Sequence, residues 1–169
     1  ENFEIFDVSG MLKKPQVVTL TSKEAEVKKG GFPHFMLKEI FESAEVVRDS
    51  TRGRVVSETG EIKLGGLTAV ESDLQNCTRL QLVGCGSAYY AALTGKYLIE
   101  KFAGVPVSVD LASEYRYQAH CHGAGEIVLA VSQSGETADT LEAIKIAKAH
   151  NLRTLGIVNT VGSSIARET

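Results

Sequence analysis

Residues 130–140 read AVSQSGETADT, and this stretch decides the fold. An apolar run at residues 127–131 breaks abruptly into the hydroxyl-rich turn 132–137, and a helical pattern follows over residues 138–150. Continuous apolar runs of this length are typical of strands that are buried on both faces of a parallel sheet. The stretch therefore predicts a strand that ends in a turn and continues as a helix of an α/β fold.

The turn after this strand is also the strongest candidate for a binding site. The first N–H groups of a helix have no partner inside the helix, and the helix dipole places partial positive charge there. Ser132, Ser134 and Thr137 add hydroxyl groups, and Gln133 adds a side-chain amide. Such a site favours an anion such as phosphate, held by neutral donors. Glu136 would repel an anion, so we expect its carboxylate to point away from the ligand.

The same succession of strand, turn and helix recurs through the second half of the chain. Strands alternating with helices predict a doubly wound parallel sheet, for which we expect the flavodoxin-like order 2-1-3-4. Within the first of these helices we expect Ala91, Ala92, Leu98, Ile99 and Phe102 to face inward. Strands are predicted at residues 79–83, 105–111, 126–132 and 154–159, and helices at 88–103, 113–118 (capped by Ser113), 138–150 and from 162–164 onward.

In that strand order the first and third strands are neighbours where the order reverses, which is where ligands bind in open α/β sheets. The first strand ends in GCGSA at residues 84–88 and the third in SQSGET, so the two turns should face each other across one crevice. Gly86 would let the backbone approach a ligand, or would adopt a conformation closed to other residues. Ser87 would cap the helix that follows. Both motifs can also be read as helix starts alone, although four side-chain donors in SQSGET exceed what a cap needs.

The first part of the chain has a different composition. Residues 3–6 and 17–20 have strand character and enclose a turn signal at 7–10, which predicts a small hairpin. Residues 21–31 are polar, lysine-rich and end in two glycines, which is typical of a linker. Further helices are predicted from Pro33 to about Arg52 and over residues 68–76.

The overall composition excludes several classes of function. The 169 residues are 43% hydrophobic and 23% charged, which is ordinary for a globular domain with a core. A net charge of −3 without a basic patch argues against nucleic acid and anionic membranes as partners. No apolar run approaches a membrane span, and no signal peptide opens the chain. Three cysteines without a CxxC pair suit a reducing compartment, so we expect a cytoplasmic location.

Other motifs leave weaker alternatives open. Gly84-x-Gly86 with Asp110 at the end of the next strand is similar to a dinucleotide fingerprint, but that pattern needs a small residue where this chain has Tyr89. The His-Cys-His sequence at residues 120–122 could ligate a metal, although no second ligand cluster is evident and a solvated loop is the alternative. We expect no metal and no cofactor.

Three more side chains near the predicted turns carry minor hypotheses. Cys85 lies near a helix start but no histidine is evidently paired with it, so we expect a structural or ligand-contacting thiol rather than a nucleophile. Glu114 and Arg116 are interpreted chiefly as support for the short helix, with a site role as the alternative.

Residues 85–117 (CGSAYYAALTGKYLIEKFAGVPVSVDLASEYRY) and 132–148 (SQSGETADTLEAIKIAK) together resemble the first sugar-isomerase (SIS) domain of the isomerising glutamine–fructose-6-phosphate aminotransferases. The sequence KGGFPHFMLKEIFE at residues 29–42 is similar to that family's link between its glutaminase and isomerase domains, and GSSIARE at 162–168 also fits. The resemblance implies that residues 1–30 are the tail of a glutaminase domain and a linker, and that residues 31–169 are the first SIS domain, incomplete at its C-terminus.

The same resemblance implies the phosphosugar-binding part of an enzyme that makes glucosamine 6-phosphate and glutamate from fructose 6-phosphate and glutamine. The family's catalytic residues lie in a second SIS domain and tail, so the resemblance implies no catalytic residue here and an inactive piece. It also implies three partners: a phosphosugar, the rest of the parent chain, and a second copy in a homodimer. The alternative is a non-catalytic SIS module that senses a phosphosugar.

The resemblance also implies roles for single residues. The phosphate is held by Ser132, Gln133, Ser134 and Thr137, and the sugar site is lined by Cys85, Gly86 and Ser87. Ala88, where the family often has serine, receives no contact.

Overall fold

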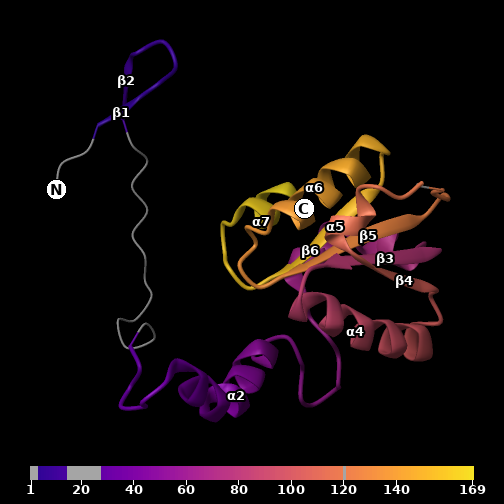
Figure 1. Cartoon of the computed structure of the whole chain (residues 1–169). Helices are drawn as coiled ribbons and strands as arrows, with labels where there is room; N and C mark the ends of the chain where they lie inside the picture. The colour runs from indigo at the N-terminus through magenta and orange to yellow at the C-terminus, as the bar shows by residue number, and fades with distance from the viewer. Residues whose placement is uncertain (1–3, 15–27, 120) are drawn as a thin grey trace. The chain divides into compact units, whose positions relative to one another are not determined.

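The computed structural model describes residues 4–14, 28–119 and 121–169 (Figure 1). The chain forms two compact units, Glu1–Lys63 and Leu64–Thr169. None of the helices in the described part of the chain combines the length and the apolar character needed to cross a bilayer.

The first unit contains a small hairpin, in which β1 (Ile5–Phe6) pairs antiparallel with β2 (Leu12–Lys13). The predicted turn between the strands is confirmed: the Asp7 carboxylate accepts the N–H groups of Ser9 and Met11, at 2.9 and 3.0 Å. The second strand begins earlier than predicted because the Asp7 side chain closes the turn at once, so the chain reverses before Leu12. The predicted strand at residues 17–20 and most of the predicted linker lie outside the described residues.

The helix α2 (Phe35–Thr51) confirms the helix predicted from Pro33 to about Arg52. The second unit opens with a 3₁₀ turn, η1 (Gly65–Val70), followed by the short helix α3 (Glu71–Gln75). The single helix predicted over residues 68–76 is therefore two shorter pieces.

The centre of the second unit is a four-stranded parallel sheet in the order β4-β3-β5-β6, which confirms the predicted flavodoxin-like order. In the register, Gly84 at the end of β3 lies opposite Leu111 of β4 and Val131 of β5. The three strands therefore end at one level, and the turns that follow them leave the same edge of the sheet. The strands are β3 (Arg79–Gly84), β4 (Val107–Leu111), β5 (Glu126–Ser132) and β6 (Arg153–Val158).

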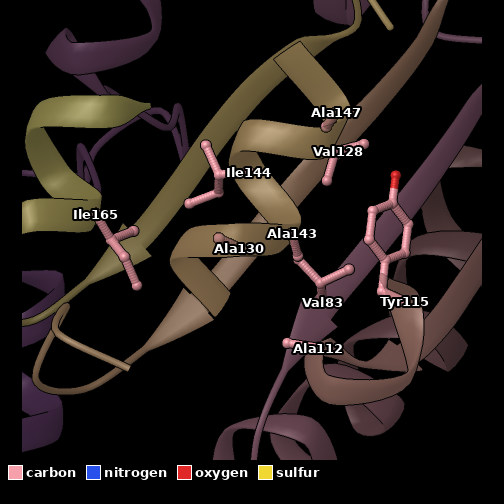
Figure 2. Packing of buried hydrophobic residues seen from close by; sticks show 9 residues of the cluster. All are labelled: Val83, Ala112, Tyr115, Val128, Ala130, Ala143, Ile144, Ala147 and Ile165. Atoms are coloured by element: carbon pink, nitrogen blue, oxygen red, sulfur yellow. The ribbon is translucent and has the colours of Figure 1, made fainter. Parts of the chain in front are cut away.

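Helices cover both faces of this sheet (Figure 1). On one face α4 (Ser87–Ala103) packs through Ala92 and Ile99 against side chains that include Leu80 and Leu82 of β3. The opposite face carries α5 (Ala112–Tyr115), α6 (Ala138–Ala149) and α7 (Ser164–Glu168). Figure 2 shows this second core, with α6 lying over β5; its buried members are Val83, Ala112, Tyr115, Val128, Ala130, Ala143, Ile144, Ala147 and Ile165.

The inward face predicted for α4 is only partly right. Ala92 is buried and Ile99 is half-buried, but Ala91 is exposed, and Leu98 and Phe102 are 53% and 77% exposed. The reason is geometric: α4 covers the sheet with a narrow stripe, in which Ala92 and Ile99 are two turns apart, so the neighbouring positions point away from the strands.

Two predicted helix caps are also wrong. Ser87 is the first residue of α4 and Gly86 is its N-cap, while the N-cap of α5 is Leu111 rather than Ser113. Both helices begin sooner after their strands than predicted, so a glycine and the last residue of a strand occupy the capping positions. Neither cap makes a side-chain hydrogen bond.

Candidate functional site

Two turns, which we name the β3 turn (residues 85–87) and the β5 turn (residues 132–137), lie at the same edge of the sheet. Their parent strands are hydrogen-bonded neighbours, paired up to Gly84 opposite Val131. The β3 turn also contacts the helix that follows the β5 turn, because the Thr140 hydroxyl in the first part of α6 donates to the Cys85 Sγ at 3.9 Å. The predicted adjacency of the two strands that carry these turns is therefore confirmed.

The β3 turn is shaped by its glycine. Gly86 has φ 57° and ψ −131°, a conformation that other residues rarely adopt, as predicted. A Cβ atom at Gly86 would have no heavy atom within 4 Å, so space is not the reason for glycine there. Ser87 is exposed at the start of α4, and Cys85 is half-buried against the core beneath α6.

The β5 turn uses its own serines to hold its backbone. The Ser132 Oγ accepts the N–H of Gly135 at 3.0 Å, and the Ser134 Oγ accepts the N–H of Glu136 at 3.2 Å. A hydroxyl that accepts a hydrogen bond still has its own proton to donate. Ser134 is exposed and can donate to a ligand, whereas Ser132 is only 5% exposed, so its first role is to fold the turn.

The other two predicted residues of the β5 turn also lie at the start of α6. Thr137 is the N-cap of α6, and its carbonyl accepts the N–H of Leu141 at 3.0 Å. Its hydroxyl makes no capping hydrogen bond, although threonine at this position commonly does. The Gln133 residue is exposed, and its carbonyl accepts the Thr160 hydroxyl at 3.3 Å. The turn thus presents uncharged donors at the positive end of a twelve-residue helix.

The acidic side chains near this helix start are held by other groups. The Glu136 carboxylate accepts the N–H of Ser164 at 2.9 Å, and its hydrogen bonds to Ser164 hold its pKa below the ordinary value. This contact directs the carboxylate to the start of α7. Asp139 in the first turn of α6 pairs with Arg116 at 3.5 Å. Arg116 therefore links α5 to α6 as well as supporting the short helix.

Sequence reasoning missed the residues that connect these turns to the rest of the fold. Thr140 was not singled out, although it is fully buried and contacts Cys85. The segment 160–165 forms several contacts with the β5 turn, including the hydrogen bond from Thr160 to Gln133. The only signal for this segment in the sequence is GSSIARE at residues 162–168, which predicts a helix start and carries part of the family resemblance.

Two cavities among the described residues of the second unit lie away from these turns. One of about 720 Å³ is at the opposite edge of the sheet, between His122, Glu126, His150 and Arg153, and one of about 320 Å³ lies beside Tyr115. Neither of these two cavities is lined by any of the seven residues predicted for the site.

The alternatives left open by the sequence find little support in these regions. Asp110, the acidic residue of the possible dinucleotide fingerprint, accepts a hydrogen bond from the Gln81 side chain at 2.8 Å and is engaged inside the fold. Within residues 4–14, 28–119 and 121–169 there is no cluster of three potential metal ligands, and His120 of the predicted His-Cys-His group lies outside them. All three cysteines are free thiols.

Comparison with known proteins gives many sequence relatives, including the following two. The chain is 44% identical over its whole length to a glutamine–fructose-6-phosphate aminotransferase (isomerizing) from Chlorobaculum tepidum and 41% identical to one from Bacteroides thetaiotaomicron. It spans 28% of the length of each of these curated relatives.

Solved structures give the same picture. The C-terminal domain of glucosamine-fructose-6-phosphate aminotransferase from Francisella tularensis superposes with a TM-score of 0.76 and 39% identity, covering 84% of this chain and 39% of that one. A glucosamine-6-phosphate deaminase from Thermotoga maritima, 24% identical with a TM-score of 0.62 over 80% of this chain and 38% of that one, shares the fold. The family model described as SIS domain matches residues 73–169, which include the whole sheet and both turns. This chain therefore belongs to the SIS domain family.

Proposed function

We propose that the chain is the phosphosugar-binding part of an isomerising glutamine–fructose-6-phosphate aminotransferase. The observation that carries the proposal is the β5 turn, which presents neutral donors at the start of α6 beside the turn of the neighbouring strand. A phosphate dianion suits such a site, because helix N-termini favour anions and the nearby acidic groups Glu136 and Asp139 are engaged elsewhere. The names of the sequence relatives support fructose 6-phosphate as the sugar.

Each predicted residue has a place in this proposal. Ser134 and Thr137 donate their hydroxyl protons to the phosphate, and Gln133 donates its side-chain amide. Ser132 folds the turn and adds a donor only as far as its burial allows. The β3 turn faces the sugar: Gly86 allows close approach, with Cys85 and Ser87 beside it.

The proposal extends to the parent protein. Residues 1–30 are then the end of a glutaminase domain and a linker, and residues 31–169 belong to the first SIS domain. The ring opening, isomerisation and transfer of ammonia need groups from the rest of the parent chain, which we propose to act as a homodimer. A cytoplasmic location fits the three free thiols.

A non-catalytic SIS module that senses a phosphosugar is the alternative. The relatives that match the chain over its full length carry the aminotransferase name, which favours the enzyme. The parent reading frame separates the two, because a second SIS domain with a glutaminase domain supports the enzyme and a DNA-binding domain supports the sensor.

A titration with fructose 6-phosphate tests the proposal. In two-dimensional amide NMR spectra of the chain, the signals of the β5 turn should shift on adding the sugar. The double variant Ser134→Ala, Thr137→Ala should bind more weakly by about 1–3 kcal/mol, since each hydrogen bond contributes about 0.5–1.5 kcal/mol. Thr94→Ala is the control, because it removes an exposed hydroxyl from α4. A folded protein whose β5 turn signals do not respond would refute the proposal.

A further inference from the structure

The β5 turn is held from one side by the segment 160–165, which we name the brace. The Ile165 N–H donates to the Gly135 carbonyl at 2.9 Å, and the Thr160 hydroxyl donates to the Gln133 carbonyl at 3.3 Å. A third hydrogen bond of 2.9 Å joins the Ser164 N–H to the Glu136 carboxylate. The brace therefore contacts three of the six residues of the turn.

The brace also fills the space beside the turn. Gly135 has φ 69°, and a Cβ atom added to it would lie only 2.0 Å from the Oγ of Ser163. Ser163 is 3% exposed, and its hydroxyl has no hydrogen-bond partner among the described residues. Because the Ser163 side chain lies against Gly135, the β5 turn has no room to move toward the brace. The hydrogen bonds between the turn and the brace resist movement in the other direction.

Glu136 joins the brace to the predicted phosphate ligands. Its backbone N–H donates to the Ser134 Oγ at 3.2 Å, and its carboxylate accepts the Ser164 N–H. The carboxylate stays ionised at neutral pH, since its hydrogen bonds to Ser164 and the nearby Arg167 guanidinium lower its pKa. One residue thus connects a hydroxyl that faces the ligand to the first helical residue of α7.

We propose that Glu136 is a positioning residue, which sets the phosphate-binding form of the β5 turn by anchoring it to the Ser164 N–H of the brace. This inference rests on the proposed function, because the turn it positions is the proposed phosphate site. Glu136 itself does not contact the sugar phosphate. Its negative charge is tolerated at an anion site because the brace holds the carboxylate on its own side.

The Ser164 N–H can be deleted with little disturbance of the fold. Ser164 is the first residue of α7, a position that proline favours, and the preceding Ser163 has φ −65° and ψ 167°, an extended conformation compatible with a following proline. Ser164→Pro removes both the N–H and the hydroxyl, whereas Ser164→Ala removes the hydroxyl and keeps the N–H. The difference between these two variants isolates the N–H.

The experiment measures fructose 6-phosphate affinity by NMR titration for Glu136→Ala, Glu136→Gln, Ser164→Pro and Ser164→Ala. Glu136→Ala should weaken binding about tenfold, and Ser164→Pro should bind about tenfold more weakly than Ser164→Ala. Combining Glu136→Ala with Ser164→Pro should weaken binding no further than Ser164→Pro alone, since both variants remove the contact between the Glu136 carboxylate and Ser164. Glu136→Gln should recover most of the affinity, because its amide oxygen still accepts the N–H.

Amide hydrogen exchange without ligand separates positioning from general stability. In Ser164→Pro, the Gly135 and Glu136 amides should exchange faster while the β5 amides keep their wild-type rates. Equal acceleration in β5 would overturn the inference, because Glu136 would then only stabilise the whole fold. Unchanged sugar affinity in Glu136→Ala would also overturn it and leave the proposed function intact. If wild-type protein binds neither fructose 6-phosphate nor inorganic phosphate, the proposed function fails. Faster exchange confined to the β5 turn in Ser164→Pro would still show that the contact between Glu136 and Ser164 holds the turn.

Discussion

The two glycine-containing turns at the carboxyl edge of the sheet are built by opposite means. In the β3 turn a Cβ atom on Gly86 would meet nothing within 4 Å. In the β5 turn a Cβ atom on Gly135 would collide with Ser163, and segment 160–165 hydrogen-bonds to the backbone around it. Both glycines have positive φ, at 57° and 69°, but only one is also enclosed.

This difference separates the two functions that a binding edge must combine. An open turn leaves room for a ligand to approach the backbone, and its conformation depends on glycine alone. An enclosed turn keeps its donors in place before the ligand arrives, so less ordering is needed on binding. We expect substitutions in the β5 turn to lower the stability of the fold, and substitutions in the β3 turn to act mainly on the turn itself.

The largest expected effect comes from adding one methyl group to each glycine. Gly135→Ala should destabilise the fold by about 2–6 kcal/mol, because a backbone cost of about 1–3 kcal/mol adds to a similar cost of overpacking against Ser163. Gly86→Ala should carry the backbone cost alone, about 1–3 kcal/mol. Urea unfolding of both variants measures the difference. Equal losses of unfolding free energy in the two variants would mean that the contact between Ser163 and Gly135 does not add to the cost of a Cβ atom there.

A second experiment asks whether the two turns rest on one core. Burial raises the pKa of Tyr115 to about 12, with the charges of Glu126 and Asp110 adding to the effect. An unfolded tyrosine loses its proton near pH 10, so between pH 10 and 12 the folded state binds more protons and stability falls with rising pH. The expected decline is at most about 1.4 kcal/mol per pH unit, and it is absent below pH 10.

The comparison variant for that decline is Tyr115→Phe, which should show a flatter stability curve between pH 10 and 12 in urea unfolding. Tyr117→Phe is the matched control, because Tyr117 is 79% exposed and should not alter the slope. Tyr115 shares its core with Val83 and Ala130, which precede the two turns. In Tyr115→Phe, amide exchange should therefore accelerate in both turns together. Acceleration in one turn alone would show that they rest on separate supports.

The sequence was sufficient to predict the sheet because its signals are local. The two central strands, β3 and β5, end at a glycine and at a serine, and the predicted bounds of β5 agree with the structure. The expected flavodoxin-like strand order, which the structure confirms, places the two hydroxyl- and glycine-rich turns at the reversal point. The conformation of Gly86 could also be predicted, since it needs only the residue type and its place between strand and helix.

What could not be predicted depends on contacts between distant segments. Nothing in SQSGET indicates that Ser163 lies against Gly135, because that contact requires β6 to lie beside β5 and α7 to turn back. The exposure of Leu98 and Phe102 has a similar cause: an apolar pattern identifies residues that favour burial, but not how wide a stripe the sheet covers. The pairing of β2 with β1 depends on a turn in which the Asp7 carboxylate accepts the N–H groups of Ser9 and Met11, a contact made by a single side chain.

A smaller effect is expected from the contact between the β3 turn and the first part of α6. Thr140→Val keeps the shape of this fully buried side chain and removes the hydroxyl that reaches the Cys85 sulfur at 3.9 Å. Sulfur is a weak acceptor, so the loss of stability should stay below about 1 kcal/mol. A double-mutant cycle with Cys85→Ala measures the coupling. A coupling energy well above that size would mean that the β3 turn is held almost as firmly as the β5 turn.

The smallest expected effect concerns the charge beside the enclosed turn. Arg116→Gln leaves the Asp139 carboxylate unpaired at the start of α6, where it repels a bound phosphate. Both side chains are more than a third exposed, so the loss of fructose 6-phosphate affinity should be about 0.2–1 kcal/mol at low salt and should shrink as salt rises.

Lys145→Gln is the control for that variant, since it removes one positive charge from the exposed side of α6, where Lys145 pairs with Glu142. If only Arg116→Gln weakens binding, the anion responds to charge at the first turn of the helix, as expected for a site built from helix N–H groups and hydroxyls. If both variants weaken it equally, the net charge of the domain attracts the ligand. The enclosed geometry of the β5 turn would then matter for folding and not for recognition of the phosphate.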